Sequence, residues 1–322
     1  MISSQAISIG VGGWAYLPVK QTNKLEICAK IFDFVEVNSS FYKLPTEALA
    51  RKWRTIVPEL FQFSVRANRK LTHENHLEPT KQNFDEYERN LSICKLLRAF
   101  VLHFQFPPSF EVSREVVENW RGFFSSLKKE KGMNFAIEIR NKKSSENQTV
   151  RSFLDNFDII PTSDPTRNPL EVSSNSRIQY SRVFGPGEHT KWNFSTKELE
   201  SLRHIVVQTK ASKRYVTFHN ITMYEDGARL KELVKQDGKD LTAVFTGIDS
   251  LKQAIISEGI KYPISSEELS SKLGWRTVAL PDGSRIHVDE VLGNLHESII
   301  FDSLEDIVVK YKPFLPDSSV AR

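Results

Sequence analysis

Cysteine is scarce in this chain of 322 residues, and several other familiar features are missing. The two cysteines, Cys28 and Cys94, each lie in a helix-like run, so neither a disulfide framework nor a cysteine-rich zinc site is available. No window approaches about 18 uninterrupted apolar residues, and the N-terminus lacks a basic segment followed by a long apolar run. We therefore expect a cytoplasmic protein with no membrane partner.

The common phosphate-binding loops are also absent. Neither GxGxxG nor GxxxxGK[ST] follows the first strand-like run. The sequence there is GVGGWAY, which places Trp14 where a helix would have to begin. The main signs of a dinucleotide-binding or P-loop fold are therefore missing.

Charge is present in both signs but is unevenly distributed. Apolar residues make up 39% of the chain and charged residues 26%, as in an ordinary globular protein. The net charge is +4, but residues 251–322 carry 8 Lys and Arg against 11 Asp and Glu, which gives −3 there and leaves +7 for residues 1–250. A basic main domain favours an anionic ligand, such as a phosphate ester or nucleic acid, although a solvated lysine-rich surface would give the same balance.

Strand-like and helix-like segments alternate along most of the chain. Amphipathic stretches, several of which open with Ser, Thr or Asn, separate the strand-like runs. Strict alternation predicts parallel strands joined by right-handed crossovers. The predicted fold class is therefore α/β, a TIM-type (β/α)8-like barrel. The expected strands lie near residues 7–13, 33–39, 61–67, 100–106, 134–140, 157–162, 178–184 and 214–220.

This pattern ends after Val234, where the charged stretch KQDGKD follows. We expect the barrel to span residues 1–236, a linker to span 237–256, and a small α+β module to span 257–322. Within the module we expect an N-capped short helix, two strands joined by a PDG turn, and a further helix. The last residues, DSSVAR, are expected to be frayed.

Polar residues recur on one face of the expected strands. Side chains alternate along a strand, so Phe34, Glu36 and Asn38 share one face while Val35 and Val37 share the other. The C-terminal ends of the strands in such a barrel meet at one mouth, where its chemistry takes place. Burying many charges there is costly unless they have a use. The inward positions are Glu36, Asn38, Ser64, Arg66, His103, Gln105, Glu138, Arg140, Arg182 and either His219 or Asn220.

We expect three of these residues, Glu36, Glu138 and His103, to be catalytic, with the carboxylates as acid and base. Arginine forks suit phosphate or carboxylate oxygens. Aromatic residues near the mouth can stack on a base or a sugar ring, and the loop after the third strand adds a basic rim at Arg69 and Lys70. The expected substrate-binding residues are Trp14, Tyr16, Asn38, Tyr42, Arg66, His73, Gln105, Arg140, Arg182 and Asn220.

Several functions are compatible with this set. The favoured hypothesis is a hydrolase that acts on a small phosphorylated or otherwise anionic substrate. One alternative is a non-catalytic barrel that binds an anionic ligand or nucleic acid, and another is a glycosidase-like enzyme that uses Glu36 and Glu138. Glutamates with His103 and His219 also suit a divalent metal, although no HxH or HExxH spacing supports this and no metal ligands are assigned.

The order of five motifs, GVGGWAY, VEVNSSFYKLP, FSVRANRKLTH, FQFPPSF and EIRN, resembles the DUF72 family, also called YecE-like. The resemblance covers residues 7 to 236, and WNFSTKELESL and RYVTFHN extend it. It implies a TIM barrel of uncharacterised function. The family's motif positions fall on Gly13, Trp14, Tyr16, Glu36, Asn38, Phe41, Tyr42, Thr72, His73, Gln105, Pro107, Glu138, Arg140 and Arg182.

This sequence departs from the family pattern in two places. Arg66 stands where a lysine is common, which keeps the charge. EIRN lacks the histidine and the nearby tryptophan that often follow the arginine. The C-terminal segments YPISSEEL, VALPDGSRIHVDEVLGNL and FDSLEDI are similar to small archaeal modules of the DUF2795 and DUF5789 kind. This resemblance implies an archaeal source and either an adaptor module that binds a protein partner or a nucleic-acid-associated role, and the net charge of −3 disfavours direct phosphate binding.

Overall fold

The computed structural model describes residues 7–18, 23–128, 130–168, 177–187, 191–235, 246–280, 285–294 and 298–315. The chain divides into two compact units. The first comprises Met1–Ala15 and Leu25–Asp237, and the second comprises Tyr16–Lys24 and Gly238–Arg322. Each unit has its own cluster of buried apolar side chains.

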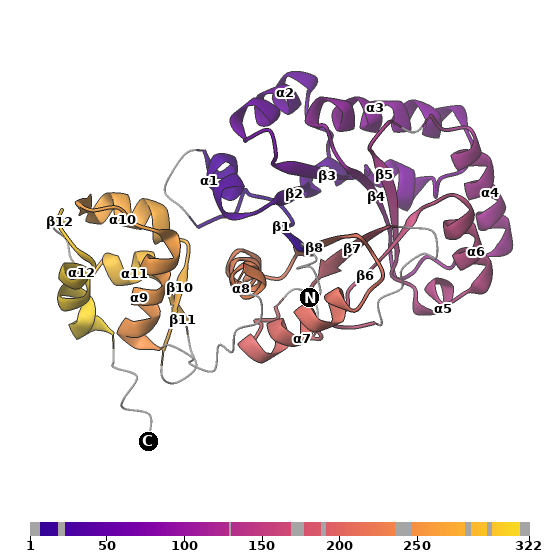
Figure 1. The fold of residues 1–322 in the computed structure, drawn as a ribbon. Helices are drawn as coiled ribbons and strands as arrows, with labels where there is room; N and C mark the ends of the chain where they lie inside the picture. The colour runs from indigo at the N-terminus through magenta and orange to yellow at the C-terminus, as the bar shows by residue number, and fades with distance from the viewer. Residues whose placement is uncertain are drawn as a thin grey trace. The chain divides into compact units, whose positions relative to one another are not determined.

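The first unit contains a closed barrel of eight strands in sequence order, and every neighbouring pair whose register is described is parallel (Figure 1). Each strand overlaps its predicted segment, so the predicted (β/α)8 barrel is confirmed. The strands are β1 (Ile7–Val11), β2 (Phe34–Val37), β3 (Gln62–Arg66), β4 (Val101–Phe106), β5 (Asn134–Ile139), β6 (Ile160–Ser163), β7 (Ile178–Val183) and β8 (Lys213–Phe218).

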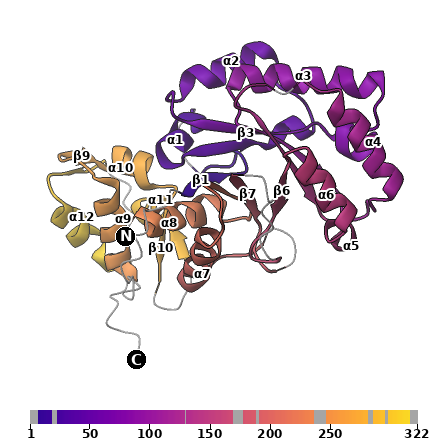
Figure 2. The same cartoon turned by 45° about the vertical axis from the view of Figure 1, so that its right-hand side comes forward.

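Helices cover the outside of the barrel, and Figure 2 shows α3, α4 and α6 following one another along it. Several begin at a side-chain cap: Ser195 and Glu198 form a capping box at the start of α7. None of the helices in the described part of the chain has the length and apolar content needed to cross a bilayer. The helices are α1 (Lys24–Ile31), α2 (Glu47–Ile56), α3 (Lys81–Leu97), α4 (Arg114–Ser125), α5 (Lys142–Ser145), α6 (Gln148–Asn156), α7 (Thr196–Val207) and α8 (Met223–Lys235), with the short turns η1 (Asn38–Phe41) and η2 (Lys70–Glu74).

The barrel interior is apolar toward the N-terminal ends of the strands. The ring of Phe34 packs edge-on against Phe100 and Tyr215, with both centroids 5.5 Å away, and Phe100 stacks on Tyr215. Ala136 and Ile160 complete this buried cluster. This apolar cluster fills the barrel at the N-terminal ends of the strands. The polar inward side chains lie toward the C-terminal ends.

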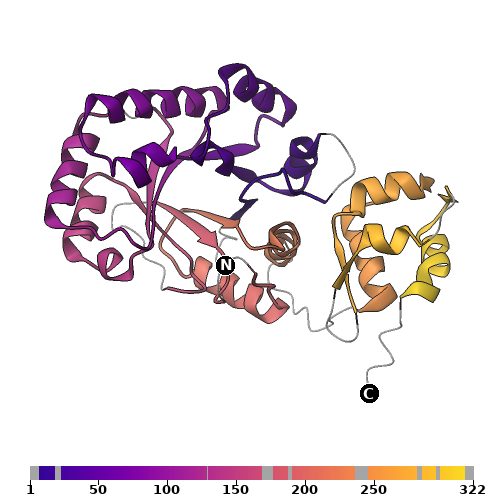
Figure 3. The same ribbon diagram turned by 180° about the vertical axis from the view of Figure 1, so that it is seen from behind.

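The C-terminal part of the second unit is a small α+β module with its own core, and its helices and strands are drawn orange to yellow in Figure 3. Its strands form two antiparallel pairs, and one of them, β10 with β11, is the predicted pair of strands. The predicted PDG turn lies outside the described residues. The elements are α9 (Gly247–Glu258), β9 (Ile264–Ser265), α10 (Ser266–Leu273), β10 (Thr277–Ala279), β11 (Arg285–His287), α11 (Val288–Leu292), β12 (Ile300–Phe301), α12 (Leu304–Tyr311) and η3 (Lys312–Phe314).

The predicted linker over 237–256 is too long. Helix α9 occupies its second half, and Ile248, Leu251 and Ile255 are buried in the core of the module. The module therefore includes α9 rather than beginning at residue 257. The frayed end predicted for DSSVAR lies outside the described residues, and the resemblance to archaeal modules stays a prediction.

Candidate active site

Two buried carboxylates share one guanidinium near the C-terminal ends of the barrel strands. Arg182 Nη2 donates to Glu36 Oε1 at 2.9 Å, and Arg182 Nη1 donates to Glu138 Oε2 at 2.5 Å. Glu36 is 0% exposed, Arg182 1% and Glu138 8%. Buried ions are costly unless they are paired, so these three side chains form one electrostatic unit.

The strand register explains why residues so distant in sequence meet. Partners in adjacent parallel strands point to the same face, and Glu138 is level with Gln105 while His103 is level with Arg66. All of these lie on the inward face predicted from alternation. The structure thus brings together the three residues expected to be catalytic.

Tyr180 joins the apolar floor to the charged layer above it. Its hydroxyl donates to Glu36 Oε2 at 2.7 Å and also hydrogen-bonds Ser64 Oγ at 2.8 Å. Burial, and then the charge of Glu36, raise the pKa of Tyr180 well above its ordinary value. Glu36 is therefore fully enclosed and fixed from below, which places it behind the mouth rather than in reach of a ligand.

Two histidines flank the carboxylates and are held neutral. His103 has Nε2 at 3.6 Å from Glu138 Oε2 and Nδ1 at 3.8 Å from Glu36 Oε2, and neither ring nitrogen has a hydrogen-bond partner among the described residues. Arg182 Nε donates to His219 Nε2 at 3.2 Å. Burial, followed by Arg182, lowers the pKa of both imidazoles well below the ordinary value. Both rings are therefore uncharged at neutral pH.

Opposing influences act on Glu138. Burial alone would raise its pKa, but Arg182 and Arg140 together hold the pKa of this carboxyl well below its ordinary value. Arg140 Nε donates to Glu138 Oε1 at 2.6 Å. Glu138 is therefore an ionised carboxylate held between two guanidiniums, and it is the more exposed of the two acids.

His219 is positioned by the close approach of strand β1. A Cβ added at Gly12 would lie 2.3 Å from His219 Nδ1, and the imidazole ring stacks on Phe184 with centroids 5.1 Å apart. Only glycine leaves room for this ring. Position 12 therefore supports the site without contacting it through a side chain.

Gly12→Ala should lower the free energy of unfolding by about 1–3 kcal/mol, because the methyl group would force His219 away from Arg182. Urea denaturation measures the change. Gly122→Ala in α4 is the matched control: its Cβ would meet Pro79 at an ordinary 3.4 Å, so it should be neutral or stabilising. Equal effects of the two substitutions would contradict the packing role of Gly12.

A second group at the mouth surrounds Arg66. Its Nη1 donates to Asn38 Oδ1 at 3.0 Å, its Nη2 donates to Gln105 Oε1, and its guanidinium lies 3.7 Å from the centre of the Phe41 ring. Burial and then Arg182 lower the pKa of Arg66 to about 10, so it stays charged. His73 packs edge-on against the same Phe41 ring, and burial followed by Arg66 lowers its pKa to about 4.

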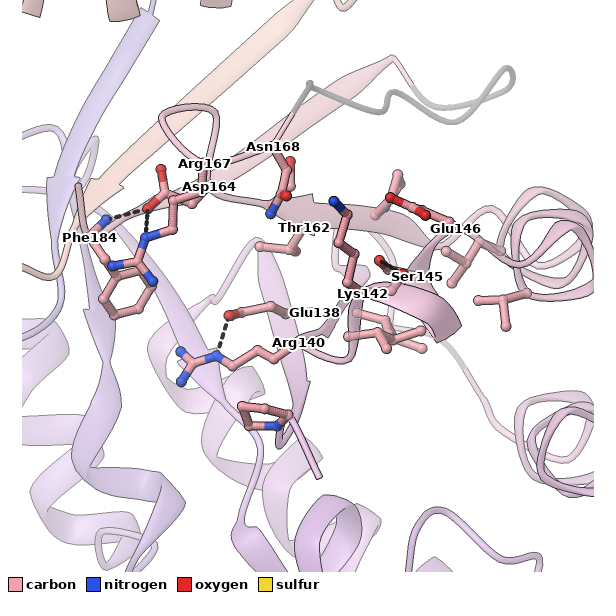
Figure 4. A pocket seen from close by; sticks show the side chains of 17 residues that line it. Glu138, Arg140, Lys142, Ser145, Glu146, Thr162, Asp164, Arg167, Asn168 and Phe184 are labelled. Atoms are coloured by element: carbon pink, nitrogen blue, oxygen red, sulfur yellow. Dashed lines mark hydrogen bonds and ion pairs between the residues drawn. The ribbon is translucent and has the colours of Figure 1, made fainter. Parts of the chain in front are cut away.

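Arg140 is the most accessible of the three arginines Arg66, Arg140 and Arg182. Its side chain is 34% exposed, and among the described residues its two terminal nitrogens have no protein acceptor. Its guanidinium lies 5.0 Å from the centre of the Phe184 ring. Figure 4 shows Arg140 with Glu138 at the edge of a cavity of about 570 Å³.

Arg182 does not have the free donors that a substrate clamp needs. All three of its nitrogens donate within the site, to Glu36, Glu138 and His219, and the side chain is 1% exposed. Its carboxylate partners raise its pKa further although burial opposes this. The geometry gives it a positioning role, in contrast to the expected contact with substrate.

Asn220 also differs from expectation, because the inward residue after β8 is His219. Asn220 is 2% exposed, and its side-chain amide donates to Trp192 O at 2.8 Å and to Asp226 Oδ2 at 2.6 Å. These bonds tie the loop before α7 to the start of α8. Asn220 is therefore structural.

The aromatic residues expected at the mouth separate into different places. Trp14 packs edge-on against Trp53 of α2, with centroids 4.9 Å apart. Tyr16 is 85% exposed and belongs to the segment Tyr16–Lys24 of the second unit. Tyr42 is 74% exposed and packs edge-on against Phe41, so it alone of these three adjoins the Arg66 group.

The basic rim after β3 is largely balanced by acids. Arg69 Nε lies 3.1 Å from Glu74 Oε1, and Lys70 Nζ lies 4.0 Å from Glu86 Oε2. Paired charges at the surface attract a polyanion less than free ones do. This rim therefore gives little support to a nucleic-acid interface.

Sequence reasoning missed Tyr180 and Phe184. Tyr180 precedes Arg182 by two residues, so the same alternation would have placed it inward. Phe184 follows the end of β7, and its ring contacts the guanidiniums of Arg140 and Arg182 and stacks on His219. Nothing in the local pattern distinguished it from a core residue.

In the part of the chain that the structure describes, no group of three or more His, Cys, Asp or Glu side chains is arranged to hold a metal ion. Arg182 occupies the space between the two carboxylates that a cation would need. The metal ligands considered from sequence, Glu36, Glu138, His103 and His219, are thus grouped around a guanidinium.

The chain resembles proteins of known structure and sequence. A family model described as "Protein of unknown function DUF72" matches residues 8–247. A DUF72 family protein of Thermotoga maritima has a TM-score of 0.60 at 20% identity and covers 71% of this chain and 99% of its own. One from Enterococcus faecalis has a TM-score of 0.58 at 18% identity and covers 71% and 97%. At these identities the likeness concerns the fold.

A curated protein is similar to this chain over a shorter span. The UPF0759 protein YunF of Bacillus subtilis is 31% identical over 152 residues, which are 42% of this chain and 51% of that protein. The chain therefore spans about half the length of this relative.

Proposed function

This chain belongs to the DUF72 family, whose function is unknown, and we propose that it is a hydrolase of a small anionic substrate. The proposal rests on the side chains of the site, because a fold alone does not define a reaction. The observation that carries the proposal is Arg140, whose Nε donates to the ionised Glu138 and whose terminal nitrogens have no protein acceptor among the described residues. Guanidinium donors of this kind suit phosphate or carboxylate oxygens.

The charge balance of the site supports an anion. Three guanidiniums, those of Arg66, Arg140 and Arg182, face two carboxylates, and the two buried histidines are neutral. The group therefore carries a net positive charge of one in a partly enclosed place, where an anion interacts more strongly than it would in water.

Glu138 is the proposed general base. It is ionised at neutral pH, lines the cavity, and accepts a proton from the water that attacks the substrate. Glu138 then gives this proton to the departing oxygen as the bond to that oxygen breaks, while the buried His103, whose Nε2 lies 3.6 Å from Glu138 Oε2, packs behind the carboxylate. Arg140 stabilises the charge that develops on the anionic group. Glu36, Arg182 and His219 hold these groups in place.

Two alternatives receive less support. A glycosidase needs a carboxylic acid whose pKa is raised so that it can protonate the leaving group, whereas the pKa of Glu138 is lowered. A barrel that binds an anion without chemistry is favoured by the complete pairing of Arg182 with its neighbours. It predicts phosphate binding with no turnover of any phosphate ester.

Release of inorganic phosphate from glycerol 3-phosphate, ribose 5-phosphate, glucose 6-phosphate and p-nitrophenyl phosphate tests the proposal. Arg140→Ala should raise KM roughly 10- to 100-fold, because charged hydrogen bonds are lost. Arg51→Ala on α2, an exposed arginine paired with Glu47 at 3.9 Å, is the matched control and should leave KM unchanged. No turnover between pH 5 and 8, or an unchanged KM in Arg140→Ala, would refute it.

A further inference from the structure

The cavity beside Arg140 extends sideways out of the barrel. Strands β5 and β6 are paired only at Ala136 with Ile160 and at Ile137 with Pro161. Beyond these two pairs β5 runs on to Ile139 and β6 to Ser163, so the strands separate toward the mouth. The cavity of about 570 Å³ lies at this split (Figure 4).

Residues from both faces of the sheet line this single cavity. Thr162 is level with Tyr180, which belongs to the inner cluster, so Thr162 faces inward as Glu138 does. Pro161 and Ser163 alternate with Thr162 and face outward, yet they line the same space. A cavity with both kinds of lining must pass between the strands, from the charged mouth toward helices α5 and α6.

Unsatisfied hydroxyl groups point to what this cavity holds. Thr162 is 7% exposed, and neither its Oγ1 nor the Oγ of Ser163 has a hydrogen-bond partner among the described residues. A buried hydroxyl without a partner is costly, so a native site of this kind calls for a ligand or water that both donates and accepts.

The rest of the lining is divided by polarity. The charged lining consists of the cations Arg140, Lys142 and Arg167 and the carboxylates Glu138, Glu146 and Asp164, and Asp164 lies 3.5 Å from Arg167 Nε (Figure 4). The helix-facing part is apolar, formed by Ile137, Val150 and Leu154. A ligand that is complementary to this cavity needs an anionic group at the end near Arg140. Its other end needs a compact carbon skeleton with hydroxyl groups for the polar lining and C–H groups for the apolar lining. The volume lies within the range of roughly 300–1,000 Å³ that is typical of small-molecule sites.

We propose that the split between β5 and β6 is the specificity pocket of the site, and that it holds the hydroxylated carbon skeleton of a phosphorylated sugar or polyol whose phosphate lies on Arg140. This inference rests on the proposed function and narrows its substrate class. Thr162 and Ser163 hydrogen-bond the ligand hydroxyls, and Ile137, Val150 and Leu154 pack against its carbon skeleton. A polymeric nucleic acid does not fit a pocket that ends against α5 and α6.

Affinities for inorganic phosphate, glycerol 3-phosphate and ribose 5-phosphate test the pocket without any need for turnover. Ribose 5-phosphate should bind the wild-type protein at least about tenfold more tightly than inorganic phosphate, because it adds several hydrogen bonds. Thr162→Val keeps the shape and removes the hydroxyl, so it should reduce this advantage about three- to tenfold. The affinity of Thr162→Val for inorganic phosphate should stay within about twofold of the wild-type value. Thr149→Val, an exposed threonine on α6, is the matched control.

Ser145→Tyr provides a second variant that does not disturb the barrel core. Ser145 lines the cavity from α5 and is partly exposed, so the larger ring should fill the pocket and abolish the ribose 5-phosphate advantage while inorganic phosphate still binds. The pocket proposal would be overturned if the wild type bound ribose 5-phosphate and inorganic phosphate equally well, or if neither variant reduced the preference for ribose 5-phosphate. Either result would leave the proposed function unaffected. No binding of inorganic phosphate would overturn both.

Discussion

Glu138→Gln should lower kcat about 10²- to 10⁴-fold while inorganic phosphate binds more tightly than to the wild type. The first effect follows because the amide cannot accept the proton. The second follows because the substitution removes a negative charge 2.6 Å from Arg140 Nε. A residue that merely shaped the pocket would weaken binding and turnover together, so opposite changes in affinity and kcat identify a base.

The pH profile gives an independent readout of the same group. A general base works when it is deprotonated, and the lowered pKa values of Glu138 and His103 keep both groups deprotonated well below their ordinary titration ranges. The kcat/KM profile should therefore show no acid limb near pH 6.5, and activity should decline only at lower pH. Glu118→Gln, an exposed glutamate on α4, is the control. An acid limb near 6.5, or a Glu138→Gln enzyme within a few-fold of the wild type, would remove Glu138 from this role.

Arg182→Met should lower the free energy of unfolding by about 3–5 kcal/mol, because it leaves two buried carboxylates without their shared cation. Adding Glu36→Gln and Glu138→Gln to this variant removes the uncompensated charges and should recover much of the loss. Urea denaturation at neutral pH measures all three proteins.

Arg214→Met distinguishes the charge effect from loss of a large buried side chain. Arg214 is also 1% exposed, but its guanidinium donates to neutral acceptors, Val206 O, Thr209 O and Thr209 Oγ1. The two glutamine substitutions should not rescue it. If they rescue both arginine variants equally, or neither, the electrostatic unit of Glu36, Arg182 and Glu138 is not what stabilises this part of the barrel.

Alternation along the strands was enough to predict much of the site. It placed Glu36, His103, Glu138 and Arg182 on one inward face. In a closed parallel barrel, all inward side chains near the C-terminal ends of the strands share the same interior. Alternation could not show how far below the mouth of the barrel each side chain lies. Whether a group reaches the mouth or lies beneath it depends on the stagger between strands, and this separates the accessible Arg140 from the enclosed Arg182.

Boundaries and irregular pairing were harder to predict. The charged stretch KQDGKD suggested a long linker, although the spacing of Ile248, Leu251 and Ile255 already carried the signal of helix α9. The choice of Asn220 over His219 failed because the end of β8 at Phe218 was not fixed. The split between β5 and β6 has no local signal, since it depends on where pairing between two distant segments stops.

Titration of inorganic phosphate into the wild-type protein and into Arg140→Ala, followed by calorimetry, tests most directly whether the barrel mouth is an anion site. The account predicts binding at one site in the wild type, weakened roughly 10- to 100-fold in Arg140→Ala. The absence of binding to the wild type, or an equal dissociation constant for the two proteins, would contradict it.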